Sequence, residues 1–286
     1  MIELFENKEI DKQKWENCLE QSERAKIYAY SWYLDIVAPN WKALIQDDYK
    51  AVFPLPIKKR LGISYISQPL FTQQLGLFSS ENSANFDDYL SQIPKKIWLR
   101  SLQVHNNSTY ATTKDNFELD ISADIEKIRE KYSQNTKRNI KKAREQQMII
   151  KGCSAESLIQ LFKANKGKEV KEMHEKSYYI LSNLLDKIQE KQKGNCYGIF
   201  KDDELISAAF FSNCFKRSIY LFAASNAYAK KVGANHLLID TYIEKYKQDS
   251  LILDFEGSKI PSLARFYASF GAVNMPYYII KRKLWK

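Results

Sequence analysis

The order of helical and strand-like patterns in the second half of the chain is the feature that most constrains its fold. The predicted elements are helices at 155–164 and 178–191, strands at 196–200, 205–214 and 218–224, a helix at 234–247, a strand at 251–255, a helix at 261–269 and a strand at 273–283. Short polar turns separate the first three strands, which predicts an antiparallel meander. The later helices predict crossover connections. This half therefore predicts an α/β lobe with a mixed sheet.

The first half gives a weaker version of the same order. Its predicted strands lie at 2–5, 41–46, 51–57, 63–67 and 97–102, and its predicted helices at 11–21, 32–37 and 85–93. Residues 103–122 lack a clear pattern and are expected to form a crossing segment. Because 286 residues are many for a single core, we predict two domains, residues 1–122 and residues 123–286.

Charge and composition limit the kinds of partner and site. The formal net charge of +10 suits an anionic partner such as a nucleotide cofactor, an RNA, or an acidic lipid or sugar-phosphate. The cysteines and histidines are Cys18, Cys153, Cys196, Cys214, His105, His174 and His236. They have no metal-ligand spacing, so we expect reduced cysteines and no metal.

No apolar run of about 18 residues is present. A charged N-terminal stretch argues against a secretory leader, and we expect a cytoplasmic protein without a transmembrane segment.

A basic stretch at residues 124–145 predicts a helix that binds anions. Its cations between residues 131 and 144 are Lys131, Lys137, Arg138, Lys141, Lys142 and Arg144, and no acid interrupts them. Lys137, Lys141 and Arg144 share one helical face. We predict that Lys137, Arg138 and Lys141 bind an anion. It would be a phosphate or carboxylate of an acceptor substrate, or the acceptor stem of a tRNA. The alternative is a solvated helix face.

A glycine turn is expected at the start of the helix at 234–247. The run Lys230-Lys231-Val232-Gly233-Ala234-Asn235 resembles the pyrophosphate loop of the GNAT acyltransferases. That loop has Arg or Gln, two free positions, Gly, one free position, and then Gly or Ala. The resemblance implies that Lys230, Lys231, Gly233 and Ala234 bind a phosphate group of acyl-CoA through backbone N–H groups and positive charge. Asn235 departs from the pattern, and an ordinary turn with solvated lysines is the alternative.

The segment LARFYASFGA at 263–272 also resembles a GNAT feature, a helical tyrosine four residues before the glycine that opens the last strand. In many members this tyrosine protonates the leaving thiolate of CoA. The resemblance implies that Tyr267 is the general acid. The alternative is a tyrosine that only packs beneath the last strand.

Two carboxylates follow one another near the end of the strand at 251–255. We predict that Glu256 is the base that accepts the proton of the amine, directly or through water; the alternative is a capping or surface carboxylate. Asp254 is expected to be a buried cap. Ser258 is expected to cap the helix that follows, with Pro261 in its first turn.

Residues 133–143, SQNTKRNIKKA, resemble the basic helix of the Fem family, and 254–258, DFEGS, resemble the end of a strand in that family. Fem proteins carry two tandem GNAT lobes and add amino acids from aminoacyl-tRNA to peptidoglycan precursors. The resemblance implies substrate contacts for Arg265 and Phe266. Fem members typically have lysine directly after this phenylalanine, whereas Tyr267 follows it here. The long coiled-coil arm of some members is also absent.

We therefore predict an α/β protein of two tandem GNAT-like lobes, the first degenerate because no phosphate-loop pattern occurs before residue 110. The predicted activity is N-acyl transfer, with acyl-CoA favoured as donor and a small amine or a peptidoglycan precursor as acceptor. A Fem-type transferase that uses aminoacyl-tRNA is the first alternative. The second is a non-catalytic RNA-binding protein that uses the basic stretch.

Overall fold

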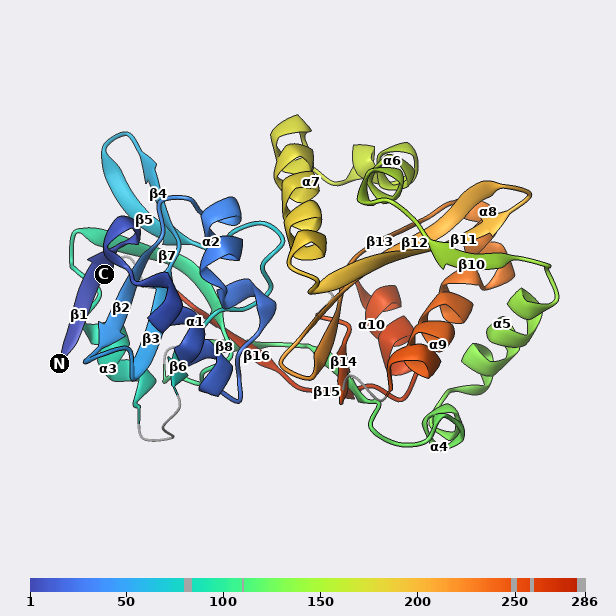
Figure 1. Ribbon diagram of the computed structural model, residues 1–286, viewed down its shortest axis with the longest axis horizontal. Helices are drawn as coiled ribbons and strands as arrows, with labels where there is room; N and C mark the ends of the chain where they lie inside the picture. Colours follow the sequence, from blue (N-terminus) through green and yellow to red (C-terminus); the bar gives the residue numbers. More distant parts are fainter. Residues whose placement is uncertain (80–83, 110, 248–250, 258–259, 282–286) are drawn as a thin grey trace. The chain divides into compact units, whose positions relative to one another are not determined.

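The computed structural model describes residues 1–286 except 80–83, 110, 248–250, 258–259 and 282–286 (Figure 1). The chain divides into two compact units, one formed by Met1–Asp115 and Pro276–Lys286 and the other by Asn116–Met275. The units differ from the predicted domains at residues 116–122 and at the C-terminal segment from Pro276. Pairing of strands in these two segments accounts for the difference, as described below.

The first unit contains two sheets. Its strands are β1 (Ile2–Glu6), β2 (Lys42–Gln46), β3 (Ala51–Leu55), β4 (Ile57–Arg60), β5 (Ile63–Ser67), β6 (Phe78–Ser79), β7 (Ile97–Val104), β8 (Ala111–Lys114) and β16 (Tyr277–Ile280). Its helices are α1 (Lys12–Gln21), α2 (Ser31–Val37) and α3 (Phe86–Ser91), with 3-10 turns at Asn7–Glu9 and Ile27–Ala29. The strand orders are β1-β2-β3-β6 and β4-β5-β7-β16-β8. Large aromatic side chains fill the core; Trp15 and Trp41, both fully buried, pack edge to face with ring centroids 4.8 Å apart.

The second unit contains one mixed sheet of seven strands in the order β10-β11-β12-β13-β14-β9-β15. The strands are β9 (Phe117–Asp120), β10 (Ile149–Gly152), β11 (Gly194–Lys201), β12 (Glu204–Cys214), β13 (Arg217–Ser225), β14 (Ile252–Asp254) and β15 (Val273–Asn274). The helices are α4 (Ile125–Glu130), α5 (Gln134–Arg144), α6 (Ala155–Asn165), α7 (Glu175–Glu190), α8 (Ala227–Val232), α9 (Ala234–Tyr246) and α10 (Pro261–Ala268), with a 3-10 turn at Gly167–Glu169. β11, β12 and β13 form the predicted antiparallel meander, and β14 joins β13 in parallel, as a crossover requires.

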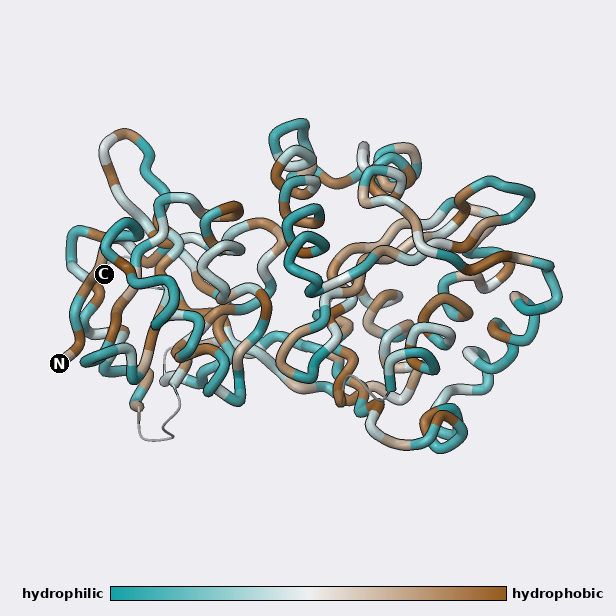
Figure 2. The backbone as a smooth tube through the Cα atoms, viewed as in Figure 1, coloured by the Kyte–Doolittle hydropathy of each residue, from teal (hydrophilic) through white to brown (hydrophobic). Residues whose placement is uncertain are grey.

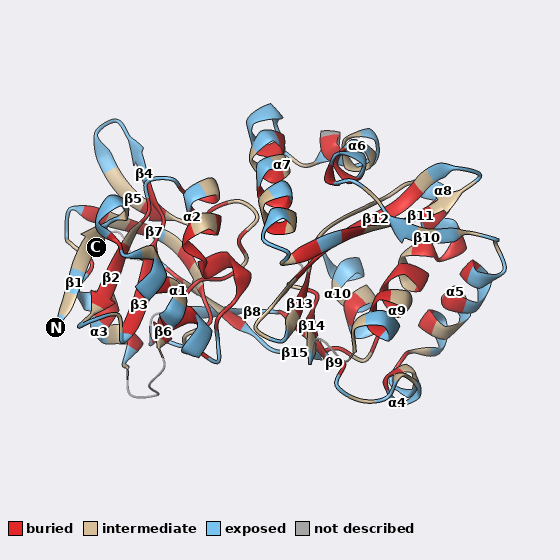
Figure 3. Ribbon diagram, viewed as in Figure 1, coloured by how far each residue is buried: buried red, intermediate tan, exposed pale blue. Residues whose placement is uncertain are grey.

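Helices cover both faces of this sheet. Figure 1 shows α6 and α7 on one face and α9 and α10 on the other. On the α9 face, Phe211 of β12 stacks on Tyr242 of α9 with ring centroids 3.6 Å apart. Buried residues follow the strands and the inner side of α9 in Figure 3, and Figure 2 shows α5 as largely hydrophilic. The burial pattern therefore agrees with a two-sided α/β lobe.

The structure differs from the prediction in several elements, and three of the differences concern how segments divide and pair. The expected strand at 273–283 is divided into β15 and β16, which belong to different sheets; Pro276, which lacks a backbone N–H, stands between them. β8 and β9 lie in the segment expected to be a connection, and β9 pairs with β14 and β15 of the second unit. The basic stretch forms α4 and α5, because the Ser133 side chain accepts a hydrogen bond from Thr136 N and starts a new helix.

Candidate functional site

A cavity of about 630 Å³ opens in the second unit where two strands of its sheet separate. β13 and β14 pair in parallel over three residue pairs, and this pairing ends at Ile219 and Asp254. The residues that follow on the two sides, 220–225 and 255–257, line the cavity. The rest of the wall comes from α8, the start of α9, α10, and the end of α6 with the segment that follows it. The sheet itself thus creates the opening.

A β-bulge shapes the β13 side of this cavity. Phe210 of β12 pairs with Phe222, and Phe211 pairs with Tyr220, so Leu221 is an extra residue in β13. Bulges bend a strand and redirect its side chains. Tyr220 and Leu221 both line the cavity next to this irregularity. Tyr220 was not identified from the sequence, because a strand tyrosine at a core spacing carries no chemical motif.

Tyr267 of α10 lines the cavity and is nearly buried. Its ring stacks on Phe255 at a centroid distance of 5.1 Å and meets Tyr220 edge to face at 6.3 Å. Burial, and secondarily the negative charge of Glu256, raise the pKa of the Tyr267 phenol well above its usual value. At neutral pH the group is therefore a protonated donor.

Glu256 follows β14 directly and also lines the cavity. Its backbone has a φ of 61°, a left-handed conformation that is uncommon for a residue other than glycine. Two hydrogen bonds hold it there: its N–H donates to Asp254 Oδ1 at 2.9 Å, and its carbonyl accepts from Phe117 N at 3.1 Å. Strain of this kind is often found at functional sites.

The buried side chain of Asp254 holds the backbone of Glu256 in place. The Asp254 carboxylate is fully buried and accepts a hydrogen bond from Arg217 Nη1 at 3.0 Å. Arg217 also pairs with Glu118 of β9 at 2.8 Å. Asp254 is thus a buried carboxylate that fixes the backbone after β14. The proposed cap Ser258 lies outside the described residues.

Gly233 joins α8 to α9 and lines the same cavity as Tyr267 and Glu256. Its φ is 82°, and a Cβ added there would lie 2.6 Å from the carbonyl oxygen of Asn139 in α5. Lys230 is exposed and lines the cavity, whereas Lys231 is exposed outside the lining and its carbonyl accepts from Lys142 Nζ. Ala234 is buried and is not part of the lining. The lysine pair occupies the last turn of α8, a helix not expected from the sequence.

Asn235, which departs from the GNAT pattern, has a structural function. Its Oδ1 accepts a hydrogen bond from Ser207 Oγ of β12 at 2.7 Å, and its Nδ2 donates to Ser225 Oγ of β13 at 3.2 Å. The amide therefore ties the start of α9 to two strands at the edge of the cavity.

His236 is a second lining residue that the sequence analysis did not assign to the site. Burial lowers its pKa to about 4, so the imidazole is neutral at pH 7. The ring lies near Phe266 and Phe270, with centroid distances of 4.8 and 5.8 Å. Within the described chain, its buried Nδ1 has no hydrogen-bond partner. Its place in the first turn after Gly233 was the signal that could have identified it.

The predicted basic residues lie elsewhere in the second unit. Lys137 and Lys141 line another cavity, of about 540 Å³. Asp240 of α9 is fully buried there and pairs with Arg129 and with Arg144, each at 2.9 Å. The basic face of α5 has no acidic residue in its own sequence, but in the folded protein the carboxylate of Asp240 from α9 lies beside it.

Other predicted substrate residues are divided between the cavity and the surface. Phe266 lines the cavity that contains Tyr267. Arg138 and Arg265 are exposed and line neither of the two cavities described so far. The structure thus brings together Tyr267, Glu256, Lys230, Gly233 and Phe266.

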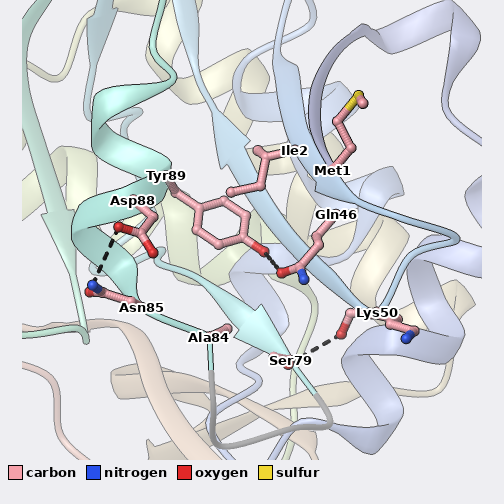
Figure 4. Close-up of a pocket in the computed structure, with 9 residues that line it drawn as sticks. All are labelled: Met1, Ile2, Gln46, Lys50, Ser79, Ala84, Asn85, Asp88 and Tyr89. Atoms are coloured by element: carbon pink, nitrogen blue, oxygen red, sulfur yellow. Dashed lines mark hydrogen bonds between the residues drawn. The ribbon is translucent and has the colours of Figure 1, made fainter.

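The first unit has cavities of its own. One of about 180 Å³ is mostly polar, and in its wall the Tyr89 hydroxyl donates a hydrogen bond to Gln46 Oε1 at 2.7 Å. Figure 4 shows these two side chains pointing toward each other. Another of about 710 Å³ lies among α3, β7, β8 and β16, and includes Leu90, Leu99 and Ile280. The smaller cavity also has a carboxylate and a phenol in its lining, Asp88 and Tyr89, but there the Tyr89 hydroxyl already donates to Gln46. The larger one has the carboxylate of Asp87 and no phenol among its described lining residues.

Within the described ranges of the chain, no helix has both the length and the apolar character needed to cross a bilayer. The same residues contain no group of three or more His, Cys, Asp or Glu side chains arranged to hold a metal ion.

Comparison with known proteins gives similarity in structure alone. No family model matches the chain, and no curated protein is similar to it in sequence. FemX aligns with a TM-score of 0.69 and 12% identity over 96% of each chain. L-PGS from Bacillus licheniformis aligns with a TM-score of 0.60 and 11% identity, over 96% of this chain and 92% of that one. A tandem GNAT protein from the clavulanic acid biosynthesis pathway aligns with a TM-score of 0.51 and 9% identity over the whole of both chains. The chain therefore has the Fem-like fold of two tandem GNAT lobes.

Proposed function

We propose that this protein transfers an acyl or aminoacyl group from an activated donor to an amine. The observation that carries the proposal is the shared cavity: Gly233, Glu256 and Tyr267, which come from three separate segments, all line it. A donor phosphate would meet the start of α9 and Lys230, since the positive end of a helix dipole and a lysine both attract anions. The reacting carbonyl would lie between Glu256 and Tyr267.

The reaction follows from these positions. The amine nitrogen attacks the carbonyl carbon and loses a proton to Glu256, directly or through water. The bond from carbon to the leaving sulfur or oxygen then breaks, and the Tyr267 hydroxyl gives that atom a proton. Solvent returns a proton to the phenolate. Positioning of donor and acceptor in one enclosed space supplies much of the acceleration.

Acyl-CoA is the donor we favour. CoA carries a pyrophosphate that suits Lys230 and the start of α9, and a narrow arm that fits along residues 220–225 of β13. Its thiolate is a good leaving group, because thiols have a pKa of about 8.5. A hydrogen bond from Tyr267 would therefore be sufficient for its departure.

Aminoacyl-tRNA is the second candidate, and the raised pKa of Tyr267 favours it. The oxygen that leaves an aminoacyl ester is much more basic than a thiolate, and a weakly acidic phenol is better matched to it. The net charge of +10 also suits a nucleic acid. The acceptor on either route is an amine, with a peptidoglycan precursor as one candidate.

The test is to incubate the whole chain with either acetyl-CoA or bulk aminoacyl-tRNA and a panel of amines that includes a peptidoglycan precursor peptide. Mass spectrometry then reports acylated products. We expect transfer from one donor only. Salt-sensitive tRNA binding without transfer would instead favour the non-catalytic RNA-binding alternative.

A further inference from the structure

Two cysteines of the second unit face each other across adjacent strands. β10 and β11 are antiparallel with Gly152 opposite Tyr197, so the next pair is Cys153 and Cys196. Cys153 N donates a backbone hydrogen bond to Cys196 O at 3.2 Å, and the two Sγ atoms are 3.0 Å apart. Opposed residues in such a hydrogen-bonded pair have Cα atoms about 5.5 Å apart. This separation is among the commonest for disulfides.

We propose that Cys153 and Cys196 are a modification site at which a peroxide forms a disulfide. The Cys153 thiolate attacks one peroxide oxygen, which yields a sulfenic acid and, after protonation, one water. The Cys196 sulfur then attacks the sulfenic sulfur, the S–S bond forms and the hydroxyl leaves as a second water. Two thiols lose two electrons in total, and the peroxide accepts them.

The surroundings of the two sulfurs set this order of attack. Cys196 is buried, whereas Cys153 is only partly covered. The hydrogen bond from Cys196 lowers the pKa of the Cys153 thiol, and the same bond together with burial raises the pKa of Cys196. The thiolate is the reactive form of cysteine. Cys153 is therefore the thiol that meets the oxidant, and Cys196 is the one that resolves the sulfenic acid.

The bond would act on the wall of the cavity described above. α6 begins two residues after Cys153, at Ala155, and its residues Phe162 and Asn165 line that cavity. A disulfide would join the start of this helix to β11 and close a loop that contains α6 and α7. The proposal rests on the strand register and the sulfur contact, so it stands whether or not the acyl-transfer proposal is correct.

The test uses the whole reduced chain, treated with hydrogen peroxide and then alkylated and digested without reductant. We expect the free thiols to fall from four to two, a linked peptide pair containing Cys153 and Cys196, and a higher thermal midpoint that reductant reverses. A variant with both Cys18→Ser and Cys214→Ser is the matched control and is expected to form the same bond. Cys153→Ser is expected to abolish it.

Two results would overturn the proposal. One is retention of both thiols, or their conversion to sulfinic acids, under conditions that oxidise free glutathione completely. The other is a cross-link that joins Cys153 or Cys196 to a different cysteine. Since the wild-type chain supplies both readouts, a serine variant that fails to fold does not affect the conclusion.

Discussion

At the scale of single residues, Tyr267 carries the most specific chemical assignment. Replacing it with phenylalanine keeps the ring stacked on Phe255 and removes only the hydroxyl. We expect kcat to fall at least about 100-fold, since general acids commonly contribute this much or more. The measurement is steady-state kinetics with the donor and amine identified by the transfer assay.

Tyr220→Phe is the matched control, because Tyr220 lines the same cavity and lies 6.3 Å from Tyr267 between ring centroids. We expect it to keep kcat within a few-fold of wild type. If Tyr220→Phe lowers kcat as much as Tyr267→Phe, or if neither changes it, Tyr267 is not the general acid.

The sequence allowed prediction of some site residues and not of others. Tyr267, Glu256 and Gly233 stand in runs with recognisable spacing, and the structure gathers them at one cavity. Tyr220 lines the cavity because it lies beside a bulge in β13. His236 lines it because the first turn of α9 faces the cavity. Both placements depend on tertiary geometry, which local patterns do not encode.

At the scale of elements, the junction of α8 and α9 depends on Gly233. An alanine there would have both a left-handed φ of 82° and a Cβ 2.6 Å from the Asn139 carbonyl oxygen. We expect Gly233→Ala to lower the free energy of unfolding by about 2–4 kcal/mol, the sum of backbone strain and a steric clash. Urea unfolding measures the change.

Gly62→Ala separates the two contributions. Gly62 has a φ of 79°, and no atom lies within 4 Å of its added Cβ. We expect this control to cost only the conformational strain, about 1–2 kcal/mol. Equal losses in the two variants would show that the contact between α5 and the glycine turn contributes nothing.

The α5 helix illustrates what a linear pattern misses. Lys137, Lys141 and Arg144 do share a face, as their spacing indicated. That face lies beside Asp240, which is 0% exposed and belongs to a helix about 100 residues later in the chain. Arg144 is therefore already paired, and the anion-binding function of this face stays a prediction.

At the scale of the whole molecule, buried phenols link stability to alkaline pH. Burial raises the pKa of a group of tyrosines, namely Tyr89, Tyr132, Tyr220, Tyr242 and Tyr267. In the unfolded chain these groups ionise near pH 10. Above that pH the unfolded chain binds fewer protons than the folded one, so stability falls as pH rises.

Below pH 10, we therefore expect the ionisation of these tyrosines to add no pH dependence to the free energy of unfolding. Above pH 10, we expect the free energy of unfolding to decrease as the pH rises. Each phenol that stays protonated contributes a loss of about 1.4 kcal/mol per pH unit. Urea unfolding at pH 8, 9 and 10.5 measures the effect, with tyrosinate absorbance as the companion signal. Ionisation of all 18 tyrosines near pH 10 in the folded protein would contradict it.

The two-lobe architecture could be predicted because each lobe repeats a recognisable order of elements. The return of the C-terminal segment to the first unit could not be predicted. There β16 pairs with β7 and β8. Such pairing joins residues more than 160 positions apart, for example Tyr277 and Lys114. Local hydrophobic patterns predict that a strand forms and leave its partner undetermined.

The central claim is that the cavity in the second unit binds the activated donor, and calorimetric titration tests it most directly. Acetyl-CoA and bulk aminoacyl-tRNA are each titrated into wild type, into Ala223→Trp, which fills that cavity, and into Thr112→Trp, which alters the large cavity of the first unit. Circular dichroism verifies that both variants are folded. We expect one donor to bind wild type and Thr112→Trp alike and Ala223→Trp at least about ten-fold more weakly, a difference of about 1.4 kcal/mol. Equal binding to all three proteins, or binding of neither donor to wild type, would contradict the account.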